Sequence, residues 1–251
     1  MQTATSPPRL ALLVLSCLLA PGGAAVAAEQ LPNIVIVYAD DLGYGDLTCY
    51  GAKDMRTPHL DKLMTEGIRF NEFYANCCVC SPSRAALLTG RYPEMVGIPG
   101  VVRTHQRSNW GYLTPDSVFL PELFQKAGYH TTLIGKWHLG LRKPNRPNQR
   151  GFDTFRGFLG DMMDDYWHHR RHNINYMYHN RQRINPQGHA TELFTTWAQE
   201  YVRARAGEKT PFFMILAYNA PHTHVPPSVD VVERVKQRAP GTMHDRARLV
   251  G

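Results

Sequence analysis

The sequence contains no apolar run long enough to cross a lipid bilayer. Its longest apolar stretch, residues 10–20, is about half of the roughly 20 residues that a spanning helix needs. Acidic residues are outnumbered by basic ones: the sequence has 21 Asp and Glu against 28 Lys and Arg, and its net charge is +7. The basic residues are scattered, with local density at 142–150 and 167–183 rather than along one helical stripe, so no nucleic-acid partner is expected. A basic surface of this kind suits polyanionic ligands, or is simply solvated.

The first 28 residues have the pattern of a signal peptide. Arg9 precedes the apolar run, and small residues at 21–28 offer cleavage sites after Ala27 or Ala28. A lipoprotein signal at Cys17 is the weaker alternative. We therefore expect a mature chain that begins near Glu29 and is exported, to a periplasm or the outside of the cell, or to the lysosome in a eukaryote. With 43% hydrophobic and 20% charged residues, the remainder can bury a core.

Cysteine is scarce as well, and removal of the leader leaves only Cys49, Cys77, Cys78 and Cys80. A disulfide within this set is possible in an exported protein. A zinc cluster of Cys77, Cys78 and Cys80 lacks the usual two-residue gap and a histidine at ligand spacing. Considered without its neighbours, Cys80 would be interpreted as an ordinary buried thiol.

The surroundings of Cys80 favour a chemical role instead. The cysteine is followed by Pro82, which fixes φ, and by Arg84, which enters the helix-forming run 85–91. This order predicts a small reactive side chain at a helix N-terminus with a fixed cation close by. Such a site favours an anion.

Three predicted strands end in chemically active residues. The β-branched run 34–38 predicts a central parallel strand, covered on both faces, that ends at Asp40 and Asp41. Residues 129–134 predict a second strand, which runs into Lys136 and His138. Residues 211–217 predict a third strand, which runs out toward His222, with His224 as a competitor. Ligands of open α/β sheets gather at the carboxyl ends of strands, so these residues are expected to meet.

The residue types at these strand ends indicate specific chemistry. Two adjacent carboxylates repel unless a hard divalent cation lies between them, although a capping turn at Asp40 and Asp41 is the simpler alternative. Side chains two apart share one face of an extended segment, so Lys136 and His138 are expected to point together toward the site. Lysine can hold an anionic oxygen, and histidine can move protons near neutral pH.

The rest of the chain is expected to be scaffold. Helices are predicted at 57–67, 117–128 and 191–205, and a strand at 68–74; with the strands above, the alternation indicates an α/β fold with a mostly parallel sheet. The loop-rich segment 141–190 is the expected seat of substrate specificity. Its His168, His169 and His172 have no partner at metal-ligand spacing, so an exposed or substrate-facing loop is expected there.

The blocks 80–91, 32–46, 135–140 and 211–222 together resemble the type I sulfatases, of the arylsulfatase and N-acetylgalactosamine-6-sulfatase kind, in the order of that family. The resemblance implies an alkaline-phosphatase-like α/β fold and a cysteine, here Cys80, that a formylglycine-generating enzyme converts to formylglycine. It also implies that Asp40, Asp41 and residue 80 hold Ca²⁺ or a similar cation. The substrate implied is a sulfated small molecule or glycan.

The resemblance also implies a role for each catalytic residue. Hydrated formylglycine at position 80 attacks sulfur and later expels sulfate by collapse to the aldehyde. Arg84 and Lys136 act electrostatically, His138 assists the diol, and His222 serves the leaving oxygen. A phosphomonoester or phosphonate hydrolase of the same superfamily is the alternative function.

In the resembling family an Asp-Asn pair, a further lysine and a smaller C-terminal domain follow this region, and residues 231–251 match none of them. Residues 29–251 are therefore interpreted as the N-terminal part of the catalytic domain, with little or no activity expected from this part alone. An inactive exported fragment is the remaining alternative.

Overall fold

The computed structural model describes residues 31–53, 55–105 and 111–222, which all belong to one compact unit, Leu31–Gly251. The expected signal peptide, His224 and residues 231–251 lie outside the described residues. Within the described part of the chain, no helix combines the length and the apolar character that a membrane span requires.

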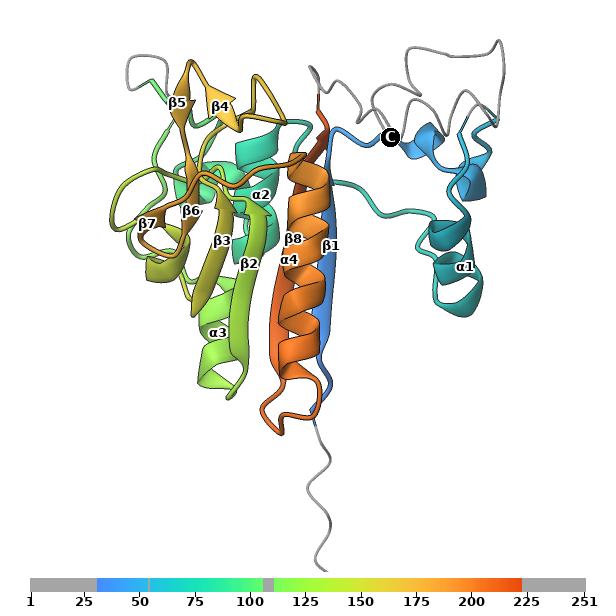
Figure 1. Ribbon diagram of the computed structural model, residues 1–251. Helices are drawn as coiled ribbons and strands as arrows, with labels where there is room; N and C mark the ends of the chain where they lie inside the picture. Colours follow the sequence, from blue (N-terminus) through green and yellow to red (C-terminus); the bar gives the residue numbers. More distant parts are fainter. Residues whose placement is uncertain (1–30, 54, 106–110, 223–251) are drawn as a thin grey trace, which may run out of the picture. The chain divides into compact units, whose positions relative to one another are not determined.

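Along the chain, β1 is followed by three α-helices, then by the strands β2 to β7, and finally by α4 and β8 (Figure 1). The strands are β1 (Ile34–Asp40), β2 (His130–Lys136), β3 (Thr154–Phe158), β4 (Arg170–Arg171), β5 (Ile174–Asn175), β6 (Met177–His179), β7 (Gln182–Arg183) and β8 (Phe212–Pro221). The α-helices are α1 (Pro58–Glu66), α2 (Cys80–Thr89), α3 (Leu120–Lys126) and α4 (Ala190–Arg205). Short 3₁₀ turns occupy Tyr44–Asp46, Thr48–Tyr50, Pro93–Val96 and Pro147–Gln149.

Six strands form one sheet in the order β1-β8-β2-β3-β6-β7. The first four are parallel, and β6 and β7 continue the sheet as antiparallel strands, which confirms the mostly parallel α/β fold. The register places Ile215 of β8 beside Ile36 of β1 and Leu133 of β2. Because β1, β8, β2 and β3 run in the same direction, their carboxyl ends lie at the same end of the sheet.

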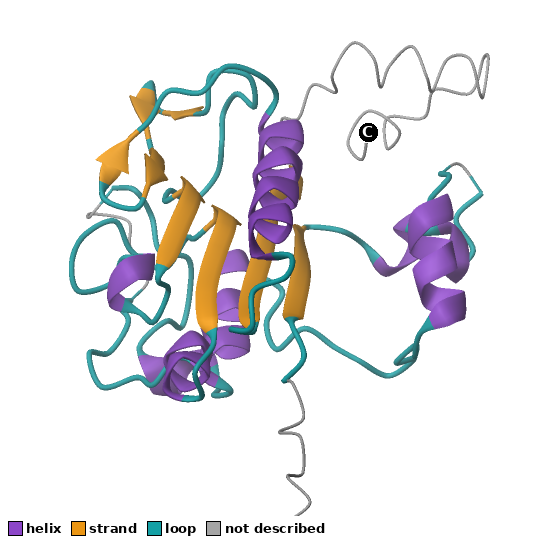
Figure 2. Ribbon diagram, turned by 60° about the horizontal axis from the view of Figure 1, so that its bottom comes forward, coloured by secondary structure: helices purple, strands orange, loops and turns teal. Residues whose placement is uncertain are grey.

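Helices cover both faces of the sheet, with α4 on one face and α2 and α3 on the other (Figures 1 and 2). Side chains of β8 alternate between two cores: Phe213 and Ile215 pack with residues of α2, whereas Met214 and Leu216 pack with α4. On α4, Phe194, Trp197 and Ala198 are buried at helical spacing. Burial of β8 on both faces explains its nearly continuous apolar sequence.

Four predictions about the scaffold were wrong, wholly or in part. Strand β1 lies at the edge of the described sheet instead of its centre, and Val35 and Val37 alternate outward with 46% and 62% of their surface exposed. Residues 68–74 form no strand; Ile68 and Phe70 are exposed in a loop. The helix predicted at 117–128 begins later, at Leu120. In the loop-rich segment 141–190, His169 is buried, whereas His168 pairs with Asp165 at the surface.

Candidate active site

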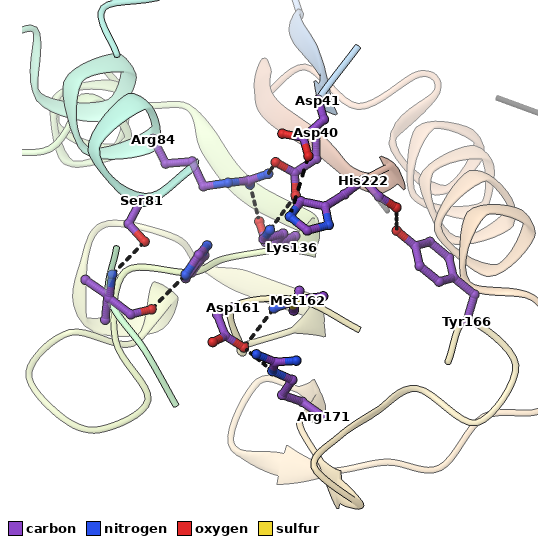
Figure 3. Close-up of polar contacts among 12 residues, drawn as sticks. Asp40, Asp41, Ser81, Arg84, Lys136, Asp161, Met162, Tyr166, Arg171 and His222 are labelled. Atoms are coloured by element: carbon purple, nitrogen blue, oxygen red, sulfur yellow. Dashed lines mark hydrogen bonds and ion pairs between the residues drawn. The ribbon is translucent and has the colours of Figure 1, made fainter. Parts of the chain in front are cut away.

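The candidate site lies at the carboxyl ends of the parallel strands. Asp40 ends β1, Lys136 ends β2, and His222 follows β8 by one residue. Cys80 is the first residue of α2, so the prediction of a cysteine at a helix N-terminus is confirmed. The structure thus gathers the predicted residues at one end of the parallel strands, as Figure 3 shows for Asp40, Lys136 and His222.

A buried group of three charged side chains forms the floor of the site. Asp40, Arg84 and Lys136 are each at most 4% exposed. The Lys136 Nζ atom contacts Asp40 Oδ2, and Arg84 Nη2 lies 3.8 Å from Asp40 Oδ1. Arg84 Nη1 also donates to the Lys136 carbonyl at 2.8 Å. Two cations therefore face one carboxylate, and the excess positive charge favours a bound anion.

The start of α2 is anchored to β1 beside this group. The Arg84 guanidinium lies over the Tyr38 ring, 5.1 Å from its centre, and the Tyr38 hydroxyl is 2.7 Å from Ser83 Oγ. Pro82 and Ser83 are buried as well. Since Arg84 contacts both β1 and the end of β2, it fixes the helix start that carries Cys80 against the strand ends.

Cys80 lies close to this charged group. Its Sγ atom, a carboxylate oxygen of Asp40 and a ring nitrogen of His222 all lie within 4.8 Å of one another. Burial is the main reason that the pKa of the Cys80 thiol is raised, and the nearby Lys136 opposes this shift. The thiols of Cys49, Cys77, Cys78 and Cys80 are free. Cys80 is therefore grouped with Asp40 and His222, and is neither disulfide-bonded nor part of a cysteine cluster with Cys77 and Cys78.

Asp41 and His138 both adopt left-handed backbone conformations, with φ of 68° and 62°. Such conformations cost on the order of 1–3 kcal/mol in non-glycine residues, and they concentrate at functional sites. Asp41 Oδ2 lies 3.5 Å from His222 Nε2, and the Asp41 side chain is half-exposed. The extended backbone predicted for His138 is wrong, because β2 ends at Lys136; the left-handed turn instead brings the ring to the pocket.

His138 is held as a neutral ring by its surroundings. Its Nε2 atom donates to the Val102 carbonyl at 2.7 Å, which leaves Nδ1 as the acceptor of the neutral ring, with no partner among the described residues. Burial, and then the positive charges of Lys136 and Arg84, keep the pKa of His138 well below its usual range. Ser81 Oγ accepts a hydrogen bond from Val102 N at 3.0 Å, so the loop that holds His138 is tied to α2.

These residues surround a pocket of about 300 Å³. Its lining combines the predicted residues Asp41, Cys80, His138 and His222 with neighbours that the sequence did not assign to this site: Cys78, Val79, Val101, Arg103, Asp161 and Met162. Asp161 follows β3 by three residues. The strand-end argument used for β1, β2 and β8 would have found Asp161 if residues 154–158 had been recognised as a strand of the same parallel sheet.

Tyr166 is a second residue that sequence reasoning missed. Its hydroxyl donates to the His222 carbonyl at 3.4 Å (Figure 3). Burial raises the pKa of Tyr166, and the negative charges of Asp40 and Asp41 add to this shift, so the hydroxyl remains a donor. No spacing in the sequence links Tyr166 to His222, since the contact depends on the path of the loop after β3.

The donor set can hold a divalent cation. Asp40 and Asp41 provide adjacent carboxylates, and His222 and residue 80 lie within reach of Asp40. A thiol is a soft ligand, whereas carboxylate oxygens suit hard cations. An oxygen in place of the Cys80 sulfur would therefore make the set more suitable for a hard cation such as Ca²⁺.

Comparison with known proteins defines the class of this chain. The sulfatase family model matches residues 32–248, so the chain belongs to the sulfatase family. It is 35% identical to rat N-acetylgalactosamine-6-sulfatase over 241 residues, which cover 89% of this chain and 45% of the relative. It is 44% identical to human arylsulfatase A over 153 residues, which cover 60% of this chain and 28% of the relative. The chain spans about half the length of the N-acetylgalactosamine-6-sulfatases that it matches.

Solved structures give the same result for the fold. The crystal structure of Ps i-CgsB matches with a TM-score of 0.78 and 33% identity, over 88% of this chain and 52% of that chain. A structure of Ps i-CgsB in complex with k-i-k-neocarrahexaose matches with a TM-score of 0.76 and 31% identity, over the same shares of the two chains. The sulfatase, alkaline-phosphatase-like fold expected from the sequence is confirmed for the described residues.

Proposed function

We propose that the protein hydrolyses sulfate monoesters, of carbohydrates or aryl alcohols, in the pocket around residue 80. The observation that carries the proposal is the convergence of a half-buried residue 80 with a buried floor in which two cations face one carboxylate. A sulfate monoester brings one negative charge, which this excess of positive charge can stabilise. Membership of the sulfatase family supports the same chemistry.

In the proposed reaction, residue 80 acts as the nucleophile after conversion of its thiol to the aldehyde of formylglycine. One hydroxyl of the hydrated aldehyde attacks sulfur, and the bond from sulfur to the alcohol oxygen breaks. The second hydroxyl then loses its proton, the aldehyde forms again, and sulfate leaves with the electron pair of its bond to residue 80. Water rehydrates the aldehyde, so atoms and charges balance over the cycle.

The surrounding side chains have separate tasks in this reaction. His138, whose neutral ring has no partner for Nδ1 among the described residues, can accept a proton from a hydroxyl of residue 80. His222, whose backbone carbonyl is held by Tyr166, can donate a proton to the departing alcohol oxygen. Lys136 and Arg84 stabilise negative charge on the sulfate oxygens and keep Asp40 in place.

Asp40, Asp41 and residue 80 would hold the divalent cation, which we propose to be Ca²⁺. When bound, the cation supplies Lewis acidity that lowers the pKa of the nucleophile and polarises the sulfate. The leader-like residues 1–28 support export of the protein. A formylglycine-generating enzyme is the proposed maturation partner. The complex of the related Ps i-CgsB with k-i-k-neocarrahexaose supports an ester of an oligosaccharide as substrate.

The test is to express the protein from its complete reading frame together with a formylglycine-generating enzyme. The peptide that contains residue 80 is expected to lose about 18 Da in the exchange of the thiol for an aldehyde. The converted protein is expected to hydrolyse an aryl sulfate, while Cys80→Ala and the unconverted protein do not. The proposal fails if the verified, converted protein leaves sulfate esters intact, or if it prefers the matched aryl phosphate.

A further inference from the structure

Asp161 is a buried carboxylate for which the proposed reaction has no use. Its side chain is 4% exposed, and its Oδ1 atom accepts from the Met162 backbone N–H at 2.8 Å. Arg171 Nε lies 3.0 Å from the same oxygen. The Oδ2 atom is buried and has no hydrogen-bond partner among the described residues, and Figure 3 shows both contacts on one oxygen only.

The fixed position of Asp161 distinguishes it from a mobile surface carboxylate. Arg171, in the short strand β4, is itself mostly buried and also contacts Asp164 Oδ1 through Nη1 at 2.6 Å. With Oδ1 held by the Met162 backbone and by Arg171, the carboxylate cannot turn without loss of both contacts. Oδ2 therefore stays in one orientation, as an acceptor for which the described residues provide no donor.

Asp161 lines the same pocket as Cys80, His138 and His222. Atoms that fill this pocket beside the reacting sulfate belong to the alcohol part of the ester. A buried carboxylate oxygen there favours a hydrogen-bond donor and disfavours a second anionic group. Asp161 is thus buried, lines the pocket and offers an unsatisfied hydrogen-bond acceptor, as a substrate-recognition residue would.

We infer that Asp161 is a specificity-determining residue whose Oδ2 atom accepts a hydrogen bond from a hydroxyl or amide N–H next to the ester of the bound substrate. The inference rests on the proposed function, since it names the substrate class of that same pocket. It predicts a preference for esters that carry a free donor beside the sulfate, such as a hexose monosulfate with a free neighbouring hydroxyl. Aryl sulfates without such a donor gain nothing from Asp161.

The substitution Asp161→Asn tests the inference with little change in shape. The Met162 N–H donates to Oδ1 and the Arg171 guanidinium lies beside it, so both favour a carbonyl oxygen at the Oδ1 position and place the amide NH₂ where Oδ2 stood. The substitution therefore replaces an acceptor by a donor. Affinity for a hexose monosulfate should fall roughly ten- to hundredfold, the usual range for a buried polar pair that becomes mismatched. Phenyl sulfate should bind within about twofold of the parent.

The matched control is Asp164→Asn, because Asp164 also contacts Arg171 but does not line the pocket. Binding of both ligands is measured by calorimetry on folded protein from the complete reading frame with Cys80 unconverted, so no turnover is required. Asp161→Ala, which removes the acceptor without adding a donor, should give a smaller loss of hexose monosulfate binding. Asp164→Asn should change neither affinity.

Several results would overturn the inference: equal affinity of parent and Asp161→Asn for hexose monosulfate, an equal loss for both ligands, or no binding of hexose monosulfate to the parent. A second measurement, kcat/KM of the converted protein for both esters, separates the two claims. If Asp161→Asn loses affinity for the hexose monosulfate alone, but neither the parent nor any variant hydrolyses an ester, the proposed hydrolysis is refuted and the role of Asp161 in recognition stands. If Asp161→Asn leaves kcat/KM unchanged for both esters, the proposed hydrolysis stands and the role of Asp161 in recognition is refuted.

Discussion

Replacement of Lys136 by methionine tests the electrostatic arrangement of the site floor. Lys136 is 1% exposed, and its ammonium contacts Asp40 Oδ2. Methionine keeps much of the apolar length of the lysine side chain, so the substitution removes charge and hydrogen bonding with little change in packing. Among the described residues, Asp40 then keeps one cationic neighbour, Arg84, whose Nη2 atom lies 3.8 Å away.

The expected cost follows from burial and from the cation that remains. Removal of one partner of a buried ion pair costs about 3–5 kcal/mol, because a buried charge is left uncompensated. Arg84 still compensates part of the Asp40 charge, so we expect the lower end, about 3 kcal/mol. For a chain of this size, that loss corresponds to a fall in Tm of roughly 6–12 °C.

Urea unfolding in the presence of a chelator measures this cost without compensation by a bound cation. Lys126→Met, at an exposed position of α3, is the matched control and should change the free energy of unfolding by less than about 0.5 kcal/mol. A cycle with Asp40→Asn should show coupling, with the double variant at least about 1 kcal/mol more stable than additivity predicts. Equal costs for Lys136→Met and Lys126→Met, or strict additivity in the cycle, would refute the ion-pair argument.

Three further predictions concern the surroundings of residue 80. Ser81→Ala should lower the free energy of unfolding by about 1–3 kcal/mol in the urea assay, because the buried Val102 N–H loses its acceptor, and an unchanged stability would contradict this role. The depressed pKa of His138 means that the unfolded chain takes up a proton near pH 6.5 while the folded chain does not. Stability should therefore fall as the pH drops below about 6.5, and His138→Gln, which keeps a donor to Val102, should flatten that slope in urea titrations at several pH values. Iodoacetamide should label the exposed Cys78 faster than Cys80, whose thiol pKa is raised by burial, and faster labelling of Cys80 by peptide mass would show a more reactive thiol than the structure implies.

Much of the site could be predicted from the sequence, because it depends on local patterns. Apolar runs at 34–38, 129–134 and 211–217 indicate strands, and the residues after them are read directly from the chain. Parallel strands bring these ends together whatever the details of the loops, so the sequence predicts that Asp40, Lys136 and His222 meet. Cys80 at the start of α2 followed from Pro82 and the helix-forming run behind it.

The environment of a strand is less predictable than its existence. The run 34–38 is as apolar as a central strand, yet in the described sheet only β8 pairs with β1. Residues 68–74 alternate in polarity as a strand would, but they find no partner within the described residues and form an exposed loop. Alternating polarity shows which side chains of a strand could share a face, whereas strand pairing depends on segments far away in the sequence.

Residues placed by loops escape sequence reasoning for a related reason. His138 reaches the pocket through a left-handed turn at φ 62°, which is uncommon for histidine, so the extended spacing argument named the right residue from the wrong geometry. Asp161 needs three tertiary facts to become visible: β3 lies parallel to β2, the loop after β3 returns to the pocket, and Arg171 arrives from β4 to hold one oxygen. The chemistry shared by a family is encoded at strand ends, where topology places it. Recognition of one ester among many depends on loop contacts such as Arg171 with Asp161, which only the folded chain reveals.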